Sequence, residues 1–430
     1  MTDAPSPASR RQFMQTAATL AATASLSAPR ISHAANERLG VGYIGCGGRA
    51  QAHLNMVRHL RDKANYPVDL TAACDVYRPR MQRALEKYSI PKGYMDHREL
   101  LADPNVDVVC IATPDHQHAR QAIDAINANK SVYCEKPITH WSQFDQLKAL
   151  HATVKASKVA FQLGTQAMSD PVWRQMKKLV QQGLIGQPVF GETSYFRLGD
   201  FGERGMHIDD PNAKPGADLN WDAWLGDRPK VPFNVDRMFR WRLFEEYAGG
   251  PVTDLYPHSA TQIIDILGVS MPDTVVAVGG IDRYEYELRT VPDTFNLLAH
   301  YPEKATLSVL GTQANDFNSI EGYRGGGQRL PYVRGYDGTL LIRNNRQIVF
   351  QPVRVKGAKQ PVIIDIEGGE DNVAHLQNLL DNHRSGTQDT WSPIDLAYRT
   401  QTAMIMAMLS YKQRRVAGFD TAAQKITMGA

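Results

Sequence analysis

Hydrophobic and polar positions alternate between two kinds of segment in the first third of the chain. Short apolar runs, each ending in a polar or glycine-containing turn, cover residues 39–44, 68–74, 106–112 and 131–134. Helix-compatible segments separate these runs, among them residues 99–103 and 118–129. Apolar runs bounded by turns predict buried strands, and their alternation with helices predicts a parallel, doubly wound α/β sheet. Because ligands of such sheets lie at the carboxyl ends of the strands, the turns after these runs are the expected binding site.

The pattern changes after about residue 156. A further apolar run covers residues 159–166, and strand-like segments then predominate, at residues 189–196, 274–280, 294–301, 304–311, 338–343 and 347–353. This series contains few helices, which predicts an α+β domain with a large, mostly antiparallel sheet. Two amphipathic helices, at about residues 371–385 and 394–415, are expected to pack back on the core.

The N-terminus has the three parts of an export signal. Arg10 and Arg11 follow a polar start, a stretch rich in Ala, Leu and Thr covers residues 16–28, and small residues precede a cleavage site near residue 35. The stretch is too short and too rich in Ala, Thr and Ser to span a bilayer stably. This order predicts a twin-arginine signal peptide over residues 1–35 and a periplasmic or otherwise exported protein. The alternative is an ordinary polar N-terminus that contains an arginine pair.

The length after this signal suits two or three domains of about 100 to 200 residues each. We place two, over residues 36–157 and 158–430. Apolar residues make up 43% of the chain and charged residues 22%, as is ordinary for a globular enzyme. The net charge is only +3, which excludes a field strong enough to attract nucleic acid, and no second apolar run approaches membrane length. We therefore expect a small-molecule partner and no membrane span.

The four cysteines all fall in the first third of the chain, at Cys46, Cys74, Cys110 and Cys134, and lack metal-ligand spacing. An exported protein is ordinarily allowed disulfides. A twin-arginine substrate, however, folds in a reducing compartment before export, so we expect four buried free thiols.

A glycine-rich turn follows the first apolar run. Gly45, Gly47 and Ala50 stand in the order G-x-G-x-x-A before a helix-compatible segment that reaches about residue 61. The first glycine permits the tight turn, the second lets the backbone approach a pyrophosphate, and the third position keeps helix and strand close. The helix N-terminus supplies unpaired amides. Strand, turn and helix in this order predict a dinucleotide-binding domain.

Asp75 ends the second apolar run, where a carboxylate would accept hydrogen bonds from both hydroxyls of an adenosine ribose. A carboxylate there repels a 2′-phosphate, which favours NAD over NADP. Arg78 and Arg80 follow closely and would soften this preference. The alternative is that Asp75 is a solvated carboxylate at a strand end.

Three further motifs resemble those of one enzyme family. They are Ala112-Thr-Pro-Asp-His-Gln-His118, Cys134-Glu-Lys-Pro137 and Gly249-Gly-Pro-Val-Thr-Asp-Leu-Tyr-Pro-His258. In this order they resemble the Gfo/Idh/MocA oxidoreductases, named for glucose-fructose oxidoreductase and inositol dehydrogenase, over essentially all of the chain after the signal. The resemblance implies an N-terminal Rossmann domain that binds NAD and a C-terminal domain for substrate binding and oligomerisation. The open-faced sheet of the second domain is commonly a subunit interface, so we expect a homo-oligomer, either a dimer or a tetramer.

The resemblance also implies a site between the second sheet and the nicotinamide, with Lys136, Asp254 and His258 as catalytic residues. Hydride removal from a carbinol carbon needs a base for the hydroxyl proton, and a histidine can act near neutral pH, so His258 is assigned this role. Lys136 would stabilise alkoxide charge, and Asp254 would bind a neighbouring hydroxyl or orient the histidine. The expected cofactor contacts are Gly45, Gly47, Gly48, Arg49, Ala50, Asp75, Thr113, Pro114, His116, His118, Glu135, Lys136 and Gln166.

Plainer interpretations stay open for the catalytic set. Lys136 could be a surface lysine and His258 a structural core histidine. Asp254 and His258 are four apart, the spacing of two ligands on one helix face, so a metal pair is a further alternative, although we expect no metal. Pro257 lies between them, which means that a helix either begins near it or is kinked there.

An aromatic and basic stretch lies between the two halves, at residues 220–226 and 237–242. Indole and guanidinium groups suit sugar rings, whose apolar faces stack on aromatics while their hydroxyls take charged hydrogen bonds. The alternative is an interdomain core with solvated arginines. The expected substrate contacts are Arg240, Trp241, Arg242 and Tyr256.

Together these features predict an exported oxidoreductase that acts on a hydroxyl or keto group of a sugar or glycoside. Because free nicotinamide cofactor is a cytoplasmic resource, the NAD(H) must be tightly bound and recycled by a substrate. One alternative is an NAD-dependent glycosidase that works by transient oxidation and elimination; members of that type tend to lack the lysine that this chain has at position 136. A second alternative is a non-catalytic sugar-binding protein of the same fold.

Overall fold

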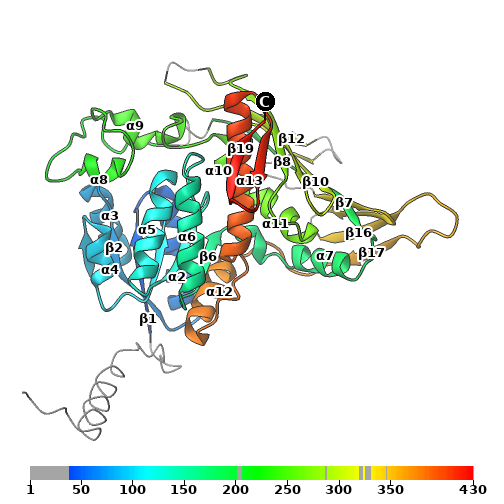
Figure 1. Cartoon of the computed structure of the whole chain (residues 1–430). Coiled ribbons are helices and arrows are strands. Elements are labelled where there is room, and N and C mark those ends of the chain that lie inside the picture. Colours follow the sequence, from blue (N-terminus) through cyan, green and yellow to red (C-terminus); the bar gives the residue numbers. More distant parts are fainter. Residues whose placement is uncertain are drawn as a thin grey trace, which may run out of the picture. The chain divides into compact units, whose positions relative to one another are not determined.

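The first sheet contains six parallel strands. The computed structural model describes residues 38–200, 206–285, 288–318, 323–324, 331–344 and 346–429, so the predicted signal peptide lies outside the described residues. The strands are β1 (Leu39–Ile44), β2 (Val68–Cys74), β3 (Lys92–Tyr94), β4 (Val108–Ile111), β5 (Ser131–Glu135) and β6 (Phe161–Gly164). Their order across the sheet is β3-β2-β1-β4-β5-β6, with the change of direction beside β1 (Figure 1). This is the predicted doubly wound arrangement.

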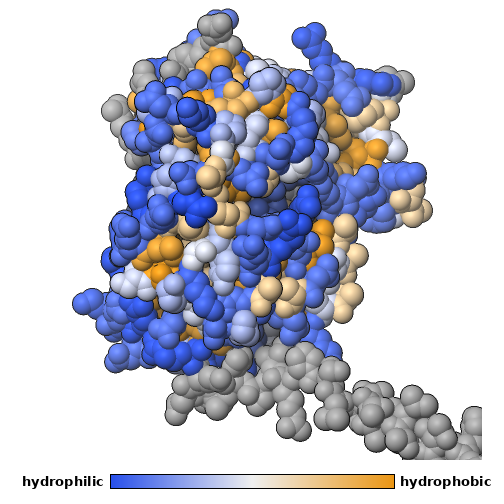
Figure 2. All heavy atoms as spheres, turned by 90° about the vertical axis from the view of Figure 1, so that its left-hand side faces the viewer, coloured by the Kyte–Doolittle hydropathy of each residue, from blue (hydrophilic) through white to orange (hydrophobic). Residues whose placement is uncertain are grey.

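Helices cover both faces of this sheet. They are α2 (Gly48–Asp62), α3 (Arg78–Tyr88), α4 (His97–Ala102), α5 (Asp115–Asn127) and α6 (Phe144–Ala156). Alternate residues of β4 enter different cores: Val108 packs with α2 and α3, and Val109 packs with α4, α5 and α6. The strands are therefore buried on both faces, which explains their continuous apolar runs. The surface on this side of the protein is mainly hydrophilic, with hydrophobic residues in small separate groups (Figure 2).

The second sheet is mostly antiparallel. Its strands are β7 (Pro188–Leu198), β8 (Thr274–Gly280), β9 (Thr294–Tyr301), β10 (Ala305–Thr312), β14 (Tyr332–Gly335), β15 (Gly338–Arg343), β16 (Gln347–Pro352), β17 (Val362–Asp365), β18 (Ala417–Asp420) and β19 (Lys425–Met428). They follow the order β17-β16-β15-β14-β7-β10-β9-β8-β18-β19, and only β7 and β10 run parallel. The short β11 (Ala314–Asn315) also pairs with β7, and β12 (Phe317–Asn318) pairs with β13 (Tyr323–Arg324).

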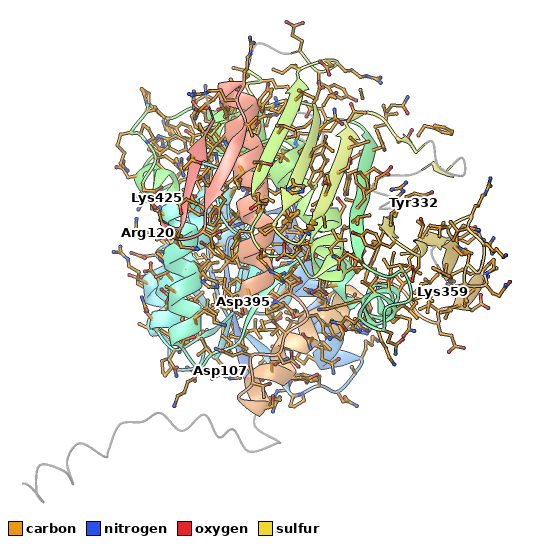
Figure 3. The ribbon with its side chains drawn as sticks, turned by 45° about the vertical axis from the view of Figure 1, so that its right-hand side comes forward. Asp107, Arg120, Tyr332, Lys359, Asp395 and Lys425 are labelled. Carbon is orange, nitrogen blue, oxygen red and sulfur yellow. The ribbon has the colours of Figure 1, made fainter. Side chains whose placement is uncertain are left out.

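The last two helices join the sheets. Helix α12 (Asn372–Ser385) packs on the first sheet, and α13 (Ile394–Gln413) contacts α6, β6 and β8 (Figure 1). Asp395, labelled in Figure 3, lies at the start of α13. It accepts hydrogen bonds from two residues of α6, from His151 Nε2 at 2.7 Å and from Lys155 Nζ at 2.9 Å. The predicted domain boundary at residue 157 is too early, because β6 still belongs to the first sheet.

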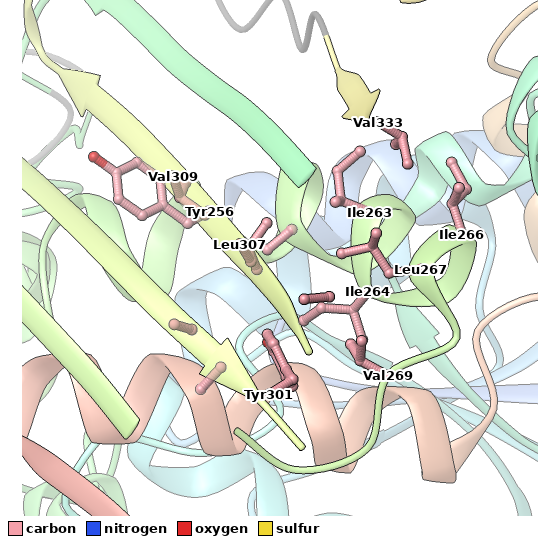
Figure 4. Packing of buried hydrophobic residues seen from close by; sticks show 14 of the residues in the cluster. Tyr256, Ile263, Ile264, Ile266, Leu267, Val269, Tyr301, Leu307, Val309 and Val333 are labelled. Atoms are coloured by element: carbon pink, nitrogen blue, oxygen red, sulfur yellow. The ribbon is translucent and has the colours of Figure 1, made fainter. Parts of the chain in front are cut away.

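The main core of the second domain lies between its sheet and helices α7 (Pro171–Gln181), α11 (Pro257–Leu267) and α13. Ile263 and Ile264 of α11 pack against Leu307 of β10 (Figure 4). Gly191 of β7 permits this approach, since a Cβ there would collide with Ile263 Cγ2. The other face of this sheet carries exposed apolar side chains, among them Val276 on β8 and Leu298 on β9.

Two simpler expectations concern cysteines and membranes. Cys46, Cys74, Cys110 and Cys134 are buried and form no disulfide, which confirms the free thiols. Within the described residues, no helix has the length and apolar character needed to cross a bilayer.

Candidate active site

A cavity of about 1140 Å³ lies at the carboxyl ends of β1, β2, β4 and β5. The second domain closes it through β7, the start of α11 and a segment of residues 206–247, which we call the cover segment. Fourteen of the predicted site residues line the cavity: Gly45, Gly47, Gly48, Arg49, Asp75, Thr113, Pro114, His118, Glu135, Lys136, Trp241, Arg242, Asp254 and His258. The cavity therefore lies where the strand-end rule predicts a binding site.

The glycine-rich turn is shaped for a pyrophosphate. Gly45 has φ +87, and a Cβ there would lie 2.8 Å from the carbonyl oxygen of Ala112, so no larger residue fits. Gly48 opens α2, and a Cβ there would meet no atom within 4 Å. No side chain caps this helix, so its first amides and the positive end of its dipole face the cavity. These residues fit the phosphates of a dinucleotide.

Asp75 is held by backbone amides at the cavity wall. Its Oδ2 accepts a hydrogen bond from Cys46 N at 2.8 Å, and its Oδ1 accepts one from Tyr77 N at 2.9 Å. Burial raises the pKa of Asp75, while the charge of Arg80 and the two amides oppose this rise. The carboxylate is thus fixed at a strand end that lines the cavity, rather than solvated.

Glu135 lines the cavity and is the centre of a buried polar network. Its Oε1 accepts hydrogen bonds from Arg49 Nε and His53 Nε2, both at 2.8 Å, and from Gln166 Nε2 at 2.9 Å. Burial alone would raise the pKa of Glu135, but Arg49 and His53 hold it well below the usual range. Gln166 also donates to Tyr133 Oη at 2.8 Å and does not line the cavity. In this structure Gln166 thus holds Glu135 and Tyr133 and does not face the cavity.

Lys136 and Asp254 form an ion pair inside the cavity. Lys136 Nζ donates to Asp254 Oδ1 at 2.9 Å and to the Asp254 carbonyl oxygen at 2.6 Å. Arg242 Nε donates to the same Oδ1 at 3.1 Å. Burial alone would raise the pKa of Asp254, but the charges of Arg242 and Lys136 hold it well below the usual range. The Lys136 side chain is only 9% exposed, which rules out the surface-lysine interpretation.

His258 reaches the same cavity from a separate helix. Asp254 ends the short helix α10 (Pro251–Asp254), and α11 begins at Pro257. The proline thus starts a new helix and does not kink one, so Asp254 and His258 do not share a single helix face. Among the residues that the structure describes, no cluster of three or more metal-ligating side chains occurs.

Asp115 is a cavity residue that the sequence reasoning did not single out, although it lies within the motif of Thr113 and Pro114. It is 2% exposed, and its Oδ2 accepts a hydrogen bond from Thr253 Oγ1 at 3.4 Å. Burial raises the pKa of Asp115 to about 7, against the opposing charge of Arg242. This carboxyl therefore changes charge near neutral pH.

The raised pKa of Asp115 predicts a pH-dependent stability. The folded protein binds this proton more tightly than the unfolded chain, so the contribution of Asp115 to stability is full below about pH 4 and is lost as the pH rises to about 7. Asp115→Asn cannot ionise, so the variant should not lose stability in this pH range through this residue. The free energy of unfolding, measured between about pH 5 and pH 8, should therefore rise for the variant relative to wild type as the pH increases. Asp145→Asn, at a side chain 94% exposed, is the matched control, and parallel curves for Asp115→Asn would contradict the assignment.

Four other predicted contacts lie away from the cavity. His116 Nε2 is 2.9 Å from the carbonyl oxygen of Trp224, and burial lowers its pKa to about 3. Ala50 is fully buried between α2 and the sheet, where it only packs. Arg240 Nη1 pairs with Asp236 Oδ1 at 3.2 Å. Tyr256 is a core residue (Figure 4), whose hydroxyl donates to the Phe295 carbonyl oxygen. None of the four lines the cavity, so the structure does not bring them together with the other site residues.

The aromatic and basic stretch has a divided role. Trp221 and Trp224 stack with ring centroids 4.7 Å apart, inside an apolar core of the cover segment that also contains α8 (Trp221–Leu225) and α9 (Val235–Phe239). The stretch also forms part of the cavity wall, through Asn220, Asp222, Ala223, Trp224, Gly226, Met238, Phe239, Trp241 and Arg242. It therefore combines an apolar core with a surface that is available to a ligand.

Comparison with known proteins supports the interpretation of the first sheet as a dinucleotide-binding domain. A family model described as the oxidoreductase family with an NAD-binding Rossmann fold (GFO_IDH_MocA) matches residues 39–165. Inositol 2-dehydrogenase of Salmonella paratyphi B is 39% identical over 134 residues, which are 30% of this chain and 40% of that protein. The match thus spans well under half of that relative's length.

Solved structures share the fold over nearly the whole chain. A levoglucosan dehydrogenase in complex with NADH has a TM-score of 0.65 at 18% identity and covers 91% of this chain and 99% of its own. An NAD binding oxidoreductase from Klebsiella pneumoniae has a TM-score of 0.65 at 21% identity, with 90% and 99% covered. Residues 39–165 thus match the NAD-binding Rossmann domain of the Gfo/Idh/MocA oxidoreductase family, and the solved structures show that the fold is shared beyond that domain.

Proposed function

We propose that the protein is an oxidoreductase that uses tightly bound NAD(H) to oxidise or reduce a hydroxyl or keto group of a sugar or glycoside. The observation that carries the proposal is the placement of Lys136, Asp254 and His258 in one cavity with the dinucleotide-binding turn. The relatives named above act, by their names, on inositol and levoglucosan, which are polyhydroxylated ring compounds. A carbohydrate substrate agrees with the charged and aromatic edge formed by Arg242 and Trp241.

Three side chains of the cavity would have distinct roles in the reaction. NAD, when bound, supplies a hydride acceptor or donor. His258 takes the hydroxyl proton of the substrate during oxidation and returns it during reduction. Lys136 donates a hydrogen bond to the reacting oxygen and stabilises its developing negative charge. Asp254 is a positioning residue, since its carboxylate holds Lys136 and Arg242.

Export sets a further condition on this cycle. If residues 1–35 direct the folded protein out of the cytoplasm, the cofactor leaves with the protein and cannot be exchanged with the cytoplasmic pool. The hydride must then return to a second substrate, or to the same substrate later in the turnover. The latter describes the glycosidase alternative, in which oxidation of one hydroxyl acidifies the neighbouring C–H bond and permits elimination of the aglycone. The presence of Lys136 in the cavity supports net redox chemistry.

A screen of the purified protein tests the proposal. Hexoses, their glycosides and keto-sugars are added singly, and the absorbance of the bound nicotinamide is followed. Reduction by one class and reoxidation by a keto-sugar are expected. Release of nitrophenol from a nitrophenyl glycoside without any added acceptor would contradict the oxidoreductase proposal and favour the glycosidase alternative. A protein that holds dinucleotide but responds to no sugar would favour the non-catalytic alternative.

We also propose that the open face of the second sheet joins copies of this chain. Its exposed apolar side chains lie on neighbouring strands β8, β9 and β10, at Val276, Val278, Leu298 and Leu310. Val276 lies opposite Leu298 in the register, so these side chains form one patch. Light scattering of the purified protein should give the mass of a dimer or tetramer, and a monomer would contradict this part of the proposal.

A further inference from the structure

Three arginines follow Asp75, and two of them line the dinucleotide cavity. They are Arg80 and Arg83 on α3, one turn apart, and a Cβ placed on Gly47 would lie 3.6 Å from Arg80 Nη1. Arg80 therefore lies directly beside the glycine-rich turn and near the strand end that carries Asp75. Arginines in this position are the groups that accommodate the 2′-phosphate of NADP. On the first domain alone, the local charge would weaken the preference for NAD that Asp75 provides.

The cover segment brings a carboxylate onto these arginines. Asp209 Oδ2 accepts a hydrogen bond from Arg80 Nε at 3.0 Å, and Asp209 Oδ1 accepts one from Arg80 Nη2 at 3.2 Å. Arg83 Nη2 donates to the same carboxylate. The Asp209 side chain is only 11% exposed and lines the cavity. The Arg80 guanidinium also lies 5.0 Å from the ring centroid of Phe239, so the cover segment holds it on two sides.

We propose that Asp209 is a cofactor-specificity residue, which selects NAD over NADP by occupying the guanidinium groups of Arg80 and Arg83. The inference rests on the use of NAD(H) proposed above and names a residue of the second domain that sets this preference. A 2′-phosphate near Asp75 would meet a second carboxylate from the opposite wall. To bind Arg80 it would have to displace a two-point carboxylate contact and leave Asp209 buried without its partner, which is costly.

A neighbouring ion pair, Arg78–Asp218, provides a control, because Asp209 could also act only by anchoring the cover segment. Arg78 Nε donates to Asp218 Oδ1 at 2.9 Å, and this contact also fastens the cover segment to the start of α3. This pair is more exposed, at 39% and 67%, and neither of its residues lines the cavity. Asp218→Asn therefore removes an aspartate–arginine contact between the same two elements without changing the charge at the cofactor.

The experiment measures which dinucleotide the full-length protein holds. Wild type, Asp209→Asn, Asp209→Glu and Asp218→Asn are each incubated with an equimolar mixture of NADH and NADPH until exchange is complete. The bound nucleotides are then released by heat and separated by chromatography. This readout does not depend on turnover or on knowing the substrate. Circular dichroism and thermal unfolding show whether each variant is folded.

Wild type and Asp218→Asn should retain NADH almost alone. Asp209→Asn should raise the ratio of bound NADPH to NADH by about tenfold or more, the value of one charge-assisted hydrogen bond to the freed arginines. Asp209→Glu keeps the carboxylate and should resemble wild type. An unchanged ratio in Asp209→Asn, or an equal rise in Asp218→Asn, would overturn the inference. Absence of any dinucleotide from wild type would instead refute the proposed function.

Discussion

His258→Ala is expected to lower turnover by orders of magnitude while leaving the dinucleotide bound. Without the imidazole, no other group assigned here takes the hydroxyl proton, so kcat should fall by about 10²- to 10⁴-fold, the range for loss of a general acid–base. The glycine-rich turn, Asp75 and Glu135 belong to the other domain and should be unaffected. The measurement pairs the rate with the amount of NAD(H) released on heat denaturation.

His207→Ala is the matched control for this variant. His207 also lines the cavity but belongs to the exposed start of the cover segment, and no proton transfer is assigned to it. Its replacement should leave kcat within a small factor of wild type. If His258→Ala retained its rate with cofactor bound, the base would be a different residue. Asp115, whose pKa lies at about 7, would then be the first candidate.

The second large effect is expected for Lys136→Met. Methionine keeps the apolar part of the side chain and removes the ammonium that points at Asp254 Oδ1. Loss of a preorganised donor to the reacting oxygen should lower kcat by about 10²- to 10³-fold. Asp254 keeps its hydrogen bond from Arg242, so the fold of the cavity should survive. Steady-state kinetics with the sugar found in the screen, together with the bound-cofactor content, measures the effect.

Lys177→Met supplies the control, because it removes another lysine–aspartate pair. Lys177 Nζ lies 2.7 Å from Asp265 Oδ1, and neither residue lines the cavity. Its kinetics should match wild type. If Lys136→Met changed KM alone and left kcat unaltered, Lys136 would bind the substrate uniformly and would not stabilise the reacting oxygen.

The elements with a strong local pattern could be predicted closely from the sequence. Strands β8, β9 and β15 have the predicted bounds, residue for residue. In β9 and β15 buried side chains alternate with more exposed ones. Several elements are not predicted from the sequence, among them helix α3 and strands β3 and β17. Strand β3 has only three residues, and most of β17 is exposed, so neither carries an alternating signal.

Some residues of the site could be predicted from local sequence, whereas others depend on contacts between distant parts of the chain. Gly45, Asp75 and Lys136 could be assigned because each ends a strand, and strand ends meet at one edge of a parallel sheet. Tyr256 shares a motif with His258, but its direction depends on how α10 and α11 pack on β9 and β10, which a motif does not encode. Asp209 carries no local signal at all. Its partner Arg80 is 129 residues away and meets it only when the cover segment folds onto α3.

We propose that the cofactor leaves the cytoplasm inside the folded protein. The most direct test of this proposal is to purify the protein from the periplasmic fraction of the producing cells, denature it by heat and quantify the dinucleotide released. A stoichiometric amount of NAD(H), with little NADP(H), is expected. A folded periplasmic protein that releases no dinucleotide, or a protein found only in the cytoplasm, would contradict it.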